Sequence, residues 1–374
     1  MLAAFGDEAL LRAALAFEAA LARAEADEQL IPAEAAALII ETCNSAPFNS
    51  ASYDIAQLAA DSAHAGTLAI ALVHRLRAAV GARDAAAAAL VHHGATSQDL
   101  ADTALMLQAK TGAQLIVAET RALAQGLEGL AQAYAHTPAL GRTLLQPALP
   151  ITFGLRAANW LLGIDAALRR FEHECAAALV LQLGGATGTL RGLSFTVVER
   201  VAAQLELAVP PVPWFARRDG IAGLATALAI LTGATGKIAR DVSLLAQAEV
   251  AETFEPRIEG RGGSSTMAHK RNPTGCQVAL SAALRTPGLA ASILAGLPQE
   301  HERGVGGWQA EAPSLATLFE LAHGALCAMR AVIDGLDVDA TAMHRNLQSA
   351  DVGEDAAQSA AQVARALDHY RRGR

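Results

Sequence analysis

The stretch from Glu259 to Gly275, EGRGGSSTMAHKRNPTG, combines residue types that could do chemistry, within a chain otherwise rich in Ala and Leu. It holds four glycines, two adjacent serines, a histidine and three cationic side chains. Glycines allow a loop to open and close, and cations hold an anion and favour the ionised form of a neighbouring acidic group. A solvated turn is the ordinary interpretation, but this combination is more specific than a run of charge. We therefore expect an anion-binding loop here.

Two further polar segments interrupt the apolar pattern. One is HHGATSQDLADT, from His92 to Thr103, and the other is GRTLLQPALPITFG, from Gly141 to Gly154. Each lies at the end of a predicted long helix, where free backbone N–H groups favour an anion. Simpler roles remain open for both. Thr96 or Ser97 can cap the following helix, and the polar residues of the second segment can close a helix junction.

Long helices must position these segments. An apolar stripe with helical spacing starts at Leu100 and reaches Tyr134, and a second runs from Leu224 to Leu245 in alternating steps of four and three. A third helix should start just after Asn272-Pro273 and run toward Leu297, with Pro287 as the place for a bend. Long heptad-like helices in one chain predict a bundle that is shared between subunits.

The composition predicts an all-α fold. Hydrophobic residues make up 52% of the 374 residues and aromatic residues only 4%, so Ala and Leu supply the apolar surface, and both favour helices. We expect a small N-terminal helical domain over 1–92, a central long-helix bundle over 93–335, and a short C-terminal helical domain over 336–374. The last part is shorter than the C-terminal domain of the family named below.

Charge and cysteine usage exclude several classes of protein. A net charge of −8 argues against nucleic acid as a partner, because binding phosphates requires a broad basic face. The four cysteines have no CxxC and no zinc-like spacing, so we expect reduced thiols in a cytoplasmic protein without a metal.

No membrane segment or signal peptide is expected. The apolar N-terminus is broken at helical intervals by charged residues, Glu18 among them, and no basic start precedes it. The uncharged run from Gly220 to Gly236 is the one membrane candidate. It is slightly short, contains three Thr and continues into charged helical sequence, which favours a buried bundle helix.

The three polar segments together resemble the fumarase/aspartase superfamily, whose signature loop reads Gly-Ser-Ser-x-Met-x-x-Lys-x-Asn. Residues 263–272, GSSTMAHKRN, match every fixed position. The other matching segments follow the family's order over about 350 residues: FEAALARAEADEQLIP, HHGATSQDLADT, GRTLLQPALPITFG, QLGGATGTL, PWFARRD, LAQAEVAETFEP and HERGVGGWQAE. Within the superfamily the sequence of these segments is most similar to the bacterial 3-carboxy-cis,cis-muconate cycloisomerases, followed by the adenylosuccinate lyases.

The resemblance implies roles for individual residues. Ser264 corresponds to the catalytic base, and Lys270 and Asn272 to the groups that hold the substrate carboxylate beside the proton that moves. His92 corresponds to an active-site histidine. The other residues that the resemblance places against substrate are Thr96, Ser97, Gln98, Arg142, Gln146 and Arg218.

The family chemistry gives these residue types a purpose. Its reactions add or remove a proton α to a carboxylate while a β C–O or C–N bond forms or breaks. The intermediate carries a second negative charge on that carboxylate, which a nearby Lys and Asn bind better than the ground state. Serine is a poor base in water, so a closed loop rich in cations has to lower its pKa.

Two positions depart from the family pattern. Lyases that protonate a leaving group usually have Arg-Thr-His in the second segment, whereas this chain has Arg142-Thr143-Leu144. In the reverse reaction of a cycloisomerase the leaving group is the substrate's own carboxylate, which needs little protonation. Leu144, expected to line the pocket, therefore favours a cycloisomerase over a lyase. Ala268 replaces the usual Pro, which should loosen the loop.

The resemblance thus implies a homotetramer with sites built from three subunits, acting on a small polycarboxylate without a cofactor. The expected reaction is lactonisation of 3-carboxy-cis,cis-muconate to 4-carboxymuconolactone, in the protocatechuate branch of the β-ketoadipate pathway. Two alternatives remain open. One is a fumarate-releasing lyase similar to adenylosuccinate lyase, and the other is a catalytically silent helical scaffold, which has no need of the set Ser264, Lys270 and Asn272.

Overall fold

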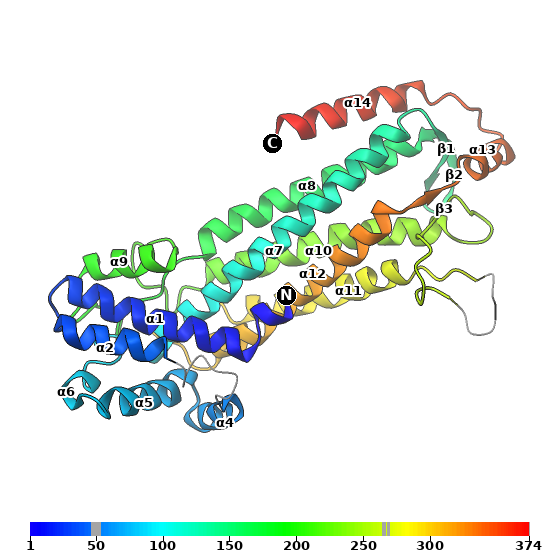
Figure 1. Cartoon of the computed structure of the whole chain (residues 1–374). Helices are drawn as coiled ribbons and strands as arrows, with labels where there is room; N and C mark the ends of the chain where they lie inside the picture. Colours follow the sequence, from blue (N-terminus) through cyan, green and yellow to red (C-terminus); the bar gives the residue numbers. More distant parts are fainter. Residues whose placement is uncertain (46–53, 264–266, 268–269, 374) are drawn as a thin grey trace. The chain divides into compact units, whose positions relative to one another are not determined.

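The computed structural model describes residues 1–45, 54–263, 267 and 270–373, and helices dominate its regular structure there, as the composition predicts (Figure 1). Ser264, the predicted base, lies outside the described residues. The helices, in chain order, are η1 (Leu2–Ala4), α1 (Asp7–Asp27), α2 (Ala33–Cys43), α4 (Ile55–Ala65), α5 (Leu68–Gly81), α6 (Ala85–Ala88), α7 (Ser97–Ala133), α8 (Phe153–Ala178), α9 (Phe195–Leu205), α10 (Asp219–Leu245), α11 (Thr274–Ala295), α12 (Gly307–Asp334), α13 (Ala340–Ser349) and α14 (Ala357–Arg372). The strands are β1 (Pro138–Thr143), β2 (Gln146–Thr152), β3 (Thr253–Phe254) and β4 (Asp337–Val338).

The chain forms two compact units. Unit 1 consists of residues 1–113, 174–224 and 291–316, and unit 2 of residues 114–173, 225–290 and 317–374. The three-part division into 1–92, 93–335 and 336–374 stays a prediction.

In unit 1 the short N-terminal helices pack on one another. α1 packs against α2 and α9, and α5 packs against α2, α4 and α6 (Figure 1). The inner face of α1 buries Leu15, Phe17 and Leu21, but the same face also buries two carboxylates, Glu18 and Glu25. Burying a carboxylate costs free energy unless it has a hydrogen-bond or ion-pair partner, so we expect Glu18 and Glu25 to have such partners inside the unit.

The three predicted long helices are confirmed. α7 covers 97–133 and fully buries four residues of the predicted stripe, Leu100, Ile116, Leu123 and Leu127. α10 covers the second stripe, and α11 starts at Thr274, directly after Asn272-Pro273, and continues through Pro287. Side chains three and four residues apart share one helix face, which is why the spacing located α7 and α10, whereas a proline located the start of α11.

Unit 2 contains a β-hairpin that the sequence analysis did not predict. β1 and β2 pair antiparallel around a two-residue turn at Leu144 and Leu145, whose φ angles are 51° and 64°. Such turns normally carry Asn or Gly, because left-handed backbone strains other side chains. Gly141 is required where the strands approach, since a Cβ there would lie 2.4 Å from the Leu149 carbonyl oxygen. α13 packs against β1, and α14 packs against β2 (Figure 1).

Three helices among the described residues are long and apolar enough to cross a membrane, judged by length and composition only: α10, α11 and α12. The expectation of a single candidate at Gly220–Gly236 was therefore too narrow. It considered only an uninterrupted run without charges, whereas a membrane-spanning helix tolerates a charge or two within an apolar stretch.

Candidate active site

The start of α7 brings the first polar segment together in unit 1. The Thr96 N–H donates to Asp99 Oδ2 at 2.9 Å, so the capping role left open for this segment is met by the Asp99 carboxylate. Asp99 is fully buried and also accepts from the N–H groups of Gly184 and Gly185 at 2.9 and 3.0 Å. Burial raises the pKa of Asp99 to about 7, although these N–H groups act to lower it. The carboxylate thus fixes the QLGGATGTL loop beside the helix start.

Arg303 joins this segment, a residue to which sequence reasoning gave no role. Its guanidinium donates to Thr96 Oγ1 at 2.8 Å, to Gln98 Oε1 at 3.3 Å and to Ser97 Oγ at 3.4 Å. It also lies 5.5 Å from the centre of the Phe215 ring. The three residues predicted to bind a carboxylate therefore surround a cation. The signal in the sequence was the matched HERGVGGWQAE segment, whose arginine was not singled out.

Two adjacent histidines are each held by a buried glutamate of α1. His92 Nδ1 lies 2.6 Å from Glu18 Oε1, and His93 Nδ1 lies 2.6 Å from Glu25 Oε1. Both glutamates are 1% exposed, and they are spaced two helical turns apart. His92 itself has a left-handed backbone, with φ of 60°. Positive φ is uncommon outside glycine and concentrates at functional sites, so the position of this imidazole is enforced by its surroundings.

The pKa values of His92 and Glu25 are both shifted in these pairs. Burial by itself lowers the pKa of His92, but the Glu18 carboxylate outweighs it, and the pKa is raised above its ordinary value. Burial raises the pKa of Glu25 to about 7, against the opposing effect of His93. Because Nδ1 of His92 faces Glu18, its other ring nitrogen is the one that can face a ligand. Glu18 thus favours an imidazolium at position 92.

Arg218 is buried in an ion-pair network of unit 1. Its guanidinium donates to both oxygens of Asp102 at 2.8 Å and to Glu311 Oε2 at 2.6 Å, and it lies 4.7 Å from the Trp214 ring centre. Burial by itself lowers the pKa of Arg218, but the two carboxylates raise it above its ordinary range. Gln98 donates to the same Asp102, at 3.2 Å. The network positions the start of α7, and substrate contact by Arg218 stays a prediction.

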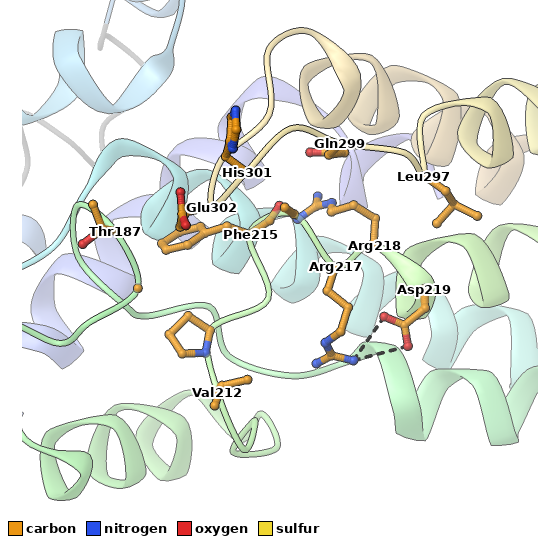
Figure 2. A pocket seen from close by; sticks show the side chains of 13 residues that line it. Thr187, Val212, Phe215, Arg217, Arg218, Asp219, Leu297, Gln299, His301 and Glu302 are labelled. Atoms are coloured by element: carbon orange, nitrogen blue, oxygen red, sulfur yellow. Dashed lines mark hydrogen bonds and ion pairs between the residues drawn. The ribbon is translucent and has the colours of Figure 1, made fainter.

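A cavity of about 690 Å³ lies in unit 1 beside these groups. Its polar lining includes Thr187, Arg217, Gln299, His301 and Glu302, with the Phe215 ring on one wall (Figure 2). Figure 2 shows the Arg217 side chain turned to Asp219, which it contacts at 3.1 Å. The volume lies within the range of small-molecule sites.

In unit 2 the signature loop lines a second cavity, of about 160 Å³. Among the described residues, its lining contains one acidic side chain, Glu255, and four cations: Arg257, Arg261, Lys270 and Arg271. Glu255 is already occupied, because it accepts from the N–H groups of Gly275 and Cys276 at the start of α11. The cavity is therefore electropositive, as an anion-binding loop requires.

Asn272 lies in the wall of the same cavity as Lys270. Its backbone N–H donates to the Gly262 carbonyl at 2.8 Å, and its side-chain amide donates to the Gly263 carbonyl at 3.3 Å. These bonds close the loop on itself, so that a lysine and an amide predicted to hold one carboxylate share one pocket. Gly262 has φ of 72° and leaves no room for a Cβ beside the Asn272 carbonyl.

The hairpin separates the three residues predicted in the second segment. Arg142 donates to both oxygens of the fully buried Glu252, at 3.0 and 2.6 Å, and Asn346 donates to the same carboxylate at 2.9 Å. Gln146 and Leu144 instead lie at the exposed end of the hairpin, with Leu144 96% exposed. Arg142 is thus engaged by Glu252, while its neighbours face outward.

The predicted residues accordingly form two groups. One belongs to unit 1 and consists of His92, Thr96, Ser97, Gln98 and Arg218; the other belongs to unit 2 and consists of Arg142, Leu144, Gln146, Lys270 and Asn272. Among the described residues, the unit 1 group gathers around the start of α7 with Arg303, and the unit 2 group divides between the hairpin and the loop cavity.

Comparisons with known proteins identify the family of the chain. Residues 1–288 match the family model described as "Lyase". The chain is 47% identical to a 3-carboxy-cis,cis-muconate cycloisomerase of Bradyrhizobium diazoefficiens, over 93% of this chain and 77% of that protein. It is 41% identical to a nitrosuccinate lyase of Streptomyces davaonensis, over 92% of this chain and 74% of that protein.

The fold likeness is equally extensive. The crystal structure of the 3-carboxy-cis,cis-muconate lactonizing enzyme from Pseudomonas putida superposes with a TM-score of 0.85 at 42% identity. It covers 92% of this chain and 76% of that one. The resemblance drawn from the signature loop is thereby confirmed. The chain belongs to the lyase family of the fumarase/aspartase superfamily, the family that includes these bacterial cycloisomerases.

Proposed function

We propose that this chain is an enzyme that lactonises 3-carboxy-cis,cis-muconate to 4-carboxymuconolactone, in the protocatechuate branch of the β-ketoadipate pathway. Its similarity to cycloisomerases at 47% identity supports the reaction class. The observation that carries the choice within the family is Leu144. Leu144 is apolar and lies at the exposed end of the hairpin, at a position where we expect a lyase to carry a proton donor.

The proposed reaction is a balanced isomerisation. A carboxylate oxygen of the substrate adds to the β carbon of a conjugated acid, forming the ring C–O bond. The electron pair of the C=C bond moves into the conjugated carboxylate, which becomes a dianion, and a proton then bonds to the α carbon. Three carboxylates become two and an ester, so one proton is taken from solvent for each molecule converted.

We assign the two groups of residues to different carboxylates of the substrate, with each group supplied by a different subunit. Lys270 and Asn272, in their electropositive cavity, are assigned to the carboxylate that gains charge. Arg303, Thr96 and Ser97 are assigned to a second carboxylate, and the His92 ring, whose pKa Glu18 raises, is assigned to the same carboxylate. Ser264 is assigned to proton delivery at the α carbon, and in the reverse direction it acts as the base.

A second candidate is a lyase that releases fumarate. It is favoured by the 41% identity to a nitrosuccinate lyase, which is only slightly below the identity to the cycloisomerases. Such a lyase breaks a β C–N bond, and this chain would have to supply any proton that the leaving group needs from a residue other than Leu144.

We further propose a cytoplasmic homotetramer in which each site takes residues from three subunits. The most apolar stretch of α10 is 61% buried, whereas that of α11 is only 28% buried. Leu144, Leu145 and Leu149 of the hairpin are 96%, 75% and 75% exposed. Subunit contacts would cover both surfaces, which supports an assembly over a membrane location.

One paired assay tests the function. The purified chain is mixed with 3-carboxy-cis,cis-muconate in weak buffer, while the absorbance of the conjugated diene and the pH are followed together. Loss of the diene with uptake of one proton per molecule is the expected result. Fumarate appearing from nitrosuccinate or adenylosuccinate, with the muconate unchanged, would establish the lyase instead. Inactivity toward all three substrates would indicate a silent scaffold.

A further inference from the structure

Three metal-ligating side chains of different types meet in unit 2, between two of its helices. His323 and Cys327 lie four residues apart on α12, so they share one face of that helix, and Glu119 approaches them from α7. The ligand atoms of all three lie within 4.8 Å of one another. Neither the proposed reaction nor the family resemblance uses these residues, and the four-residue spacing of His323 and Cys327 was not read as metal-binding from the sequence.

The distances suit a tetrahedral ion. Cys327 Sγ lies 3.6 Å from Nδ1 and 3.7 Å from Nε2 of His323. For zinc, with Zn–S about 2.3 Å and Zn–N about 2.0–2.1 Å, tetrahedral geometry puts the sulfur and nitrogen ligands roughly 3.6 Å apart. The side chains therefore need little rearrangement beyond turning one imidazole nitrogen toward the ion.

Glu119 supplies the third ligand, through an oxygen that faces the other two side chains. Its Oε2 is buried and makes no hydrogen bond among the described residues, although Arg330 Nε lies 3.2 Å away as an ion pair. The Arg330 side chain is 44% exposed, so it can move toward solvent and leave the carboxylate to a cation. A metal ion would then take the place of Arg330 as the cation paired with this buried oxygen.

The chemistry of the set selects the metal. A thiolate, an imidazole and a carboxylate favour Zn²⁺ or Co²⁺ over Mg²⁺ and Ca²⁺, which prefer oxygen ligands. Metals bind the neutral imidazole and the thiolate, so binding of the ion must displace the thiol proton of Cys327.

We propose that Glu119, His323 and Cys327 form a binding site for one Zn²⁺ or chemically similar transition-metal dication per chain, with a fourth position left for water. The ion would link α7 to α12 within unit 2 and stabilise the folded chain. This proposal does not rest on the proposed function, because none of its three ligands is assigned to substrate.

Cobalt provides the direct test. The full-length protein is treated with a chelator, exchanged into chelator-free buffer and titrated with Co²⁺. The expected result is one ion per chain with a thiolate-to-cobalt charge-transfer band, which Zn²⁺ then displaces. Cys327→Ser should abolish the band and weaken Zn²⁺ binding by roughly 100-fold or more, and His323→Gln should also weaken it. Cys43→Ala, which alters a buried thiol in unit 1, is the matched control and should keep the band.

Arg330→Gln should change the affinity of the same site for Zn²⁺ in the opposite direction. Removing this cation should tighten Zn²⁺ binding, because Arg330 competes with the ion for Glu119. All variants are first compared with the parent by circular dichroism, so that a misfolded variant is not counted. A parent protein that shows no charge-transfer band, or a band that persists in folded Cys327→Ser, would overturn the proposal.

Discussion

His92 Nδ1 lies 2.6 Å from Oε1 of Glu18, a carboxylate that is 1% exposed and comes from a helix 74 residues earlier in the chain. The contact holds the imidazole in place and raises its pKa above the value that burial would impose. Burying a glutamate on the inner face of an amphipathic helix costs free energy unless its carboxylate has such a partner. The pair therefore identifies Glu18 as the residue that positions His92.

Glu18→Gln should lower kcat/KM by roughly 100-fold while leaving the fold intact, because glutamine keeps the shape and removes the charge. Without the carboxylate, the pKa of His92 should fall. The loss of activity at high pH, where His92 becomes neutral, should then move to lower pH. A pH–rate profile measures this shift. Glu8→Gln, on the exposed side of α1, is the control. An unchanged profile would contradict the positioning role.

Glu25 should make stability depend on pH. Its folded pKa is raised from 4.5 to about 7, so the folded chain binds this proton more tightly than the unfolded chain. The resulting stabilisation is complete below pH 4.5 and is lost as the pH rises through 7, by up to roughly 3 kcal/mol of unfolding free energy. Glu25→Gln should therefore flatten the decline in stability between pH 5 and pH 8.

Urea unfolding at the two pH values, at one protein concentration, measures that difference. Glu8→Gln should keep the parent's slope, because its carboxylate is exposed. The buried Asp99, whose pKa is also raised to about 7, should leave part of the slope in place. A Glu25→Gln slope as steep as that of the parent would show that Glu25 ionises normally.

Arg303→Gln should weaken substrate binding. The arginine contributes the cation among Thr96, Ser97 and Gln98, and a charge-assisted hydrogen bond to a carboxylate contributes about 1.5–3 kcal/mol. KM should rise by roughly 10- to 100-fold, with a smaller change in kcat. Arg23→Gln, on the exposed side of α1, is the control. A parent-like KM would remove Arg303 from the carboxylate site.

Leu144→His should reduce lactonisation by roughly tenfold without unfolding the chain. The substitution places a polar ring at the exposed end of the hairpin, where an apolar wall is assigned against the substrate. Leu2→His, at a leucine of η1 that is 74% exposed and lies outside the hairpin, is the control. The test compares the steady-state kinetics of both variants with those of the parent protein. Equal kinetics for all three proteins would place residue 144 outside the site and remove the contrast with the lyases.

Shared sites predict complementation between inactive variants. His92→Ala and Ser264→Ala should each be inactive alone, but should recover activity when they are unfolded and refolded together. If each site takes these residues from different chains, roughly a quarter of the sites in randomly mixed tetramers carry neither substitution. Activity near that level is expected. Continued inactivity in tetramers verified as mixed, from variants that fold, would contradict a site shared at this pair.

Local sequence determined the helices and the signature loop. The stripes that predicted α7 and α10 depend on residues three and four apart, and the start of α11 depends on a proline, so each signal lies within its own element. The loop from 263 to 272 was recognised because its residues are contiguous. The hairpin escaped prediction because Leu144 and Leu145 occupy a turn that normally signals itself through Asn or Gly.

Tertiary structure alone decided which side chains meet. Glu18 carries the same letter whether it lies on the solvated or the buried face of α1, and only the packing of that helix brings it to His92. Arg303 reaches Thr96 across 207 residues, and Glu119 meets Cys327 across an even longer separation. Helical spacing is a property of neighbours along the chain, whereas a hydrogen bond between distant residues exists only after the chain has folded. The sequence alone therefore specified the helices and the loop motif. The tertiary structure determined which distant residues the charged side chains contact.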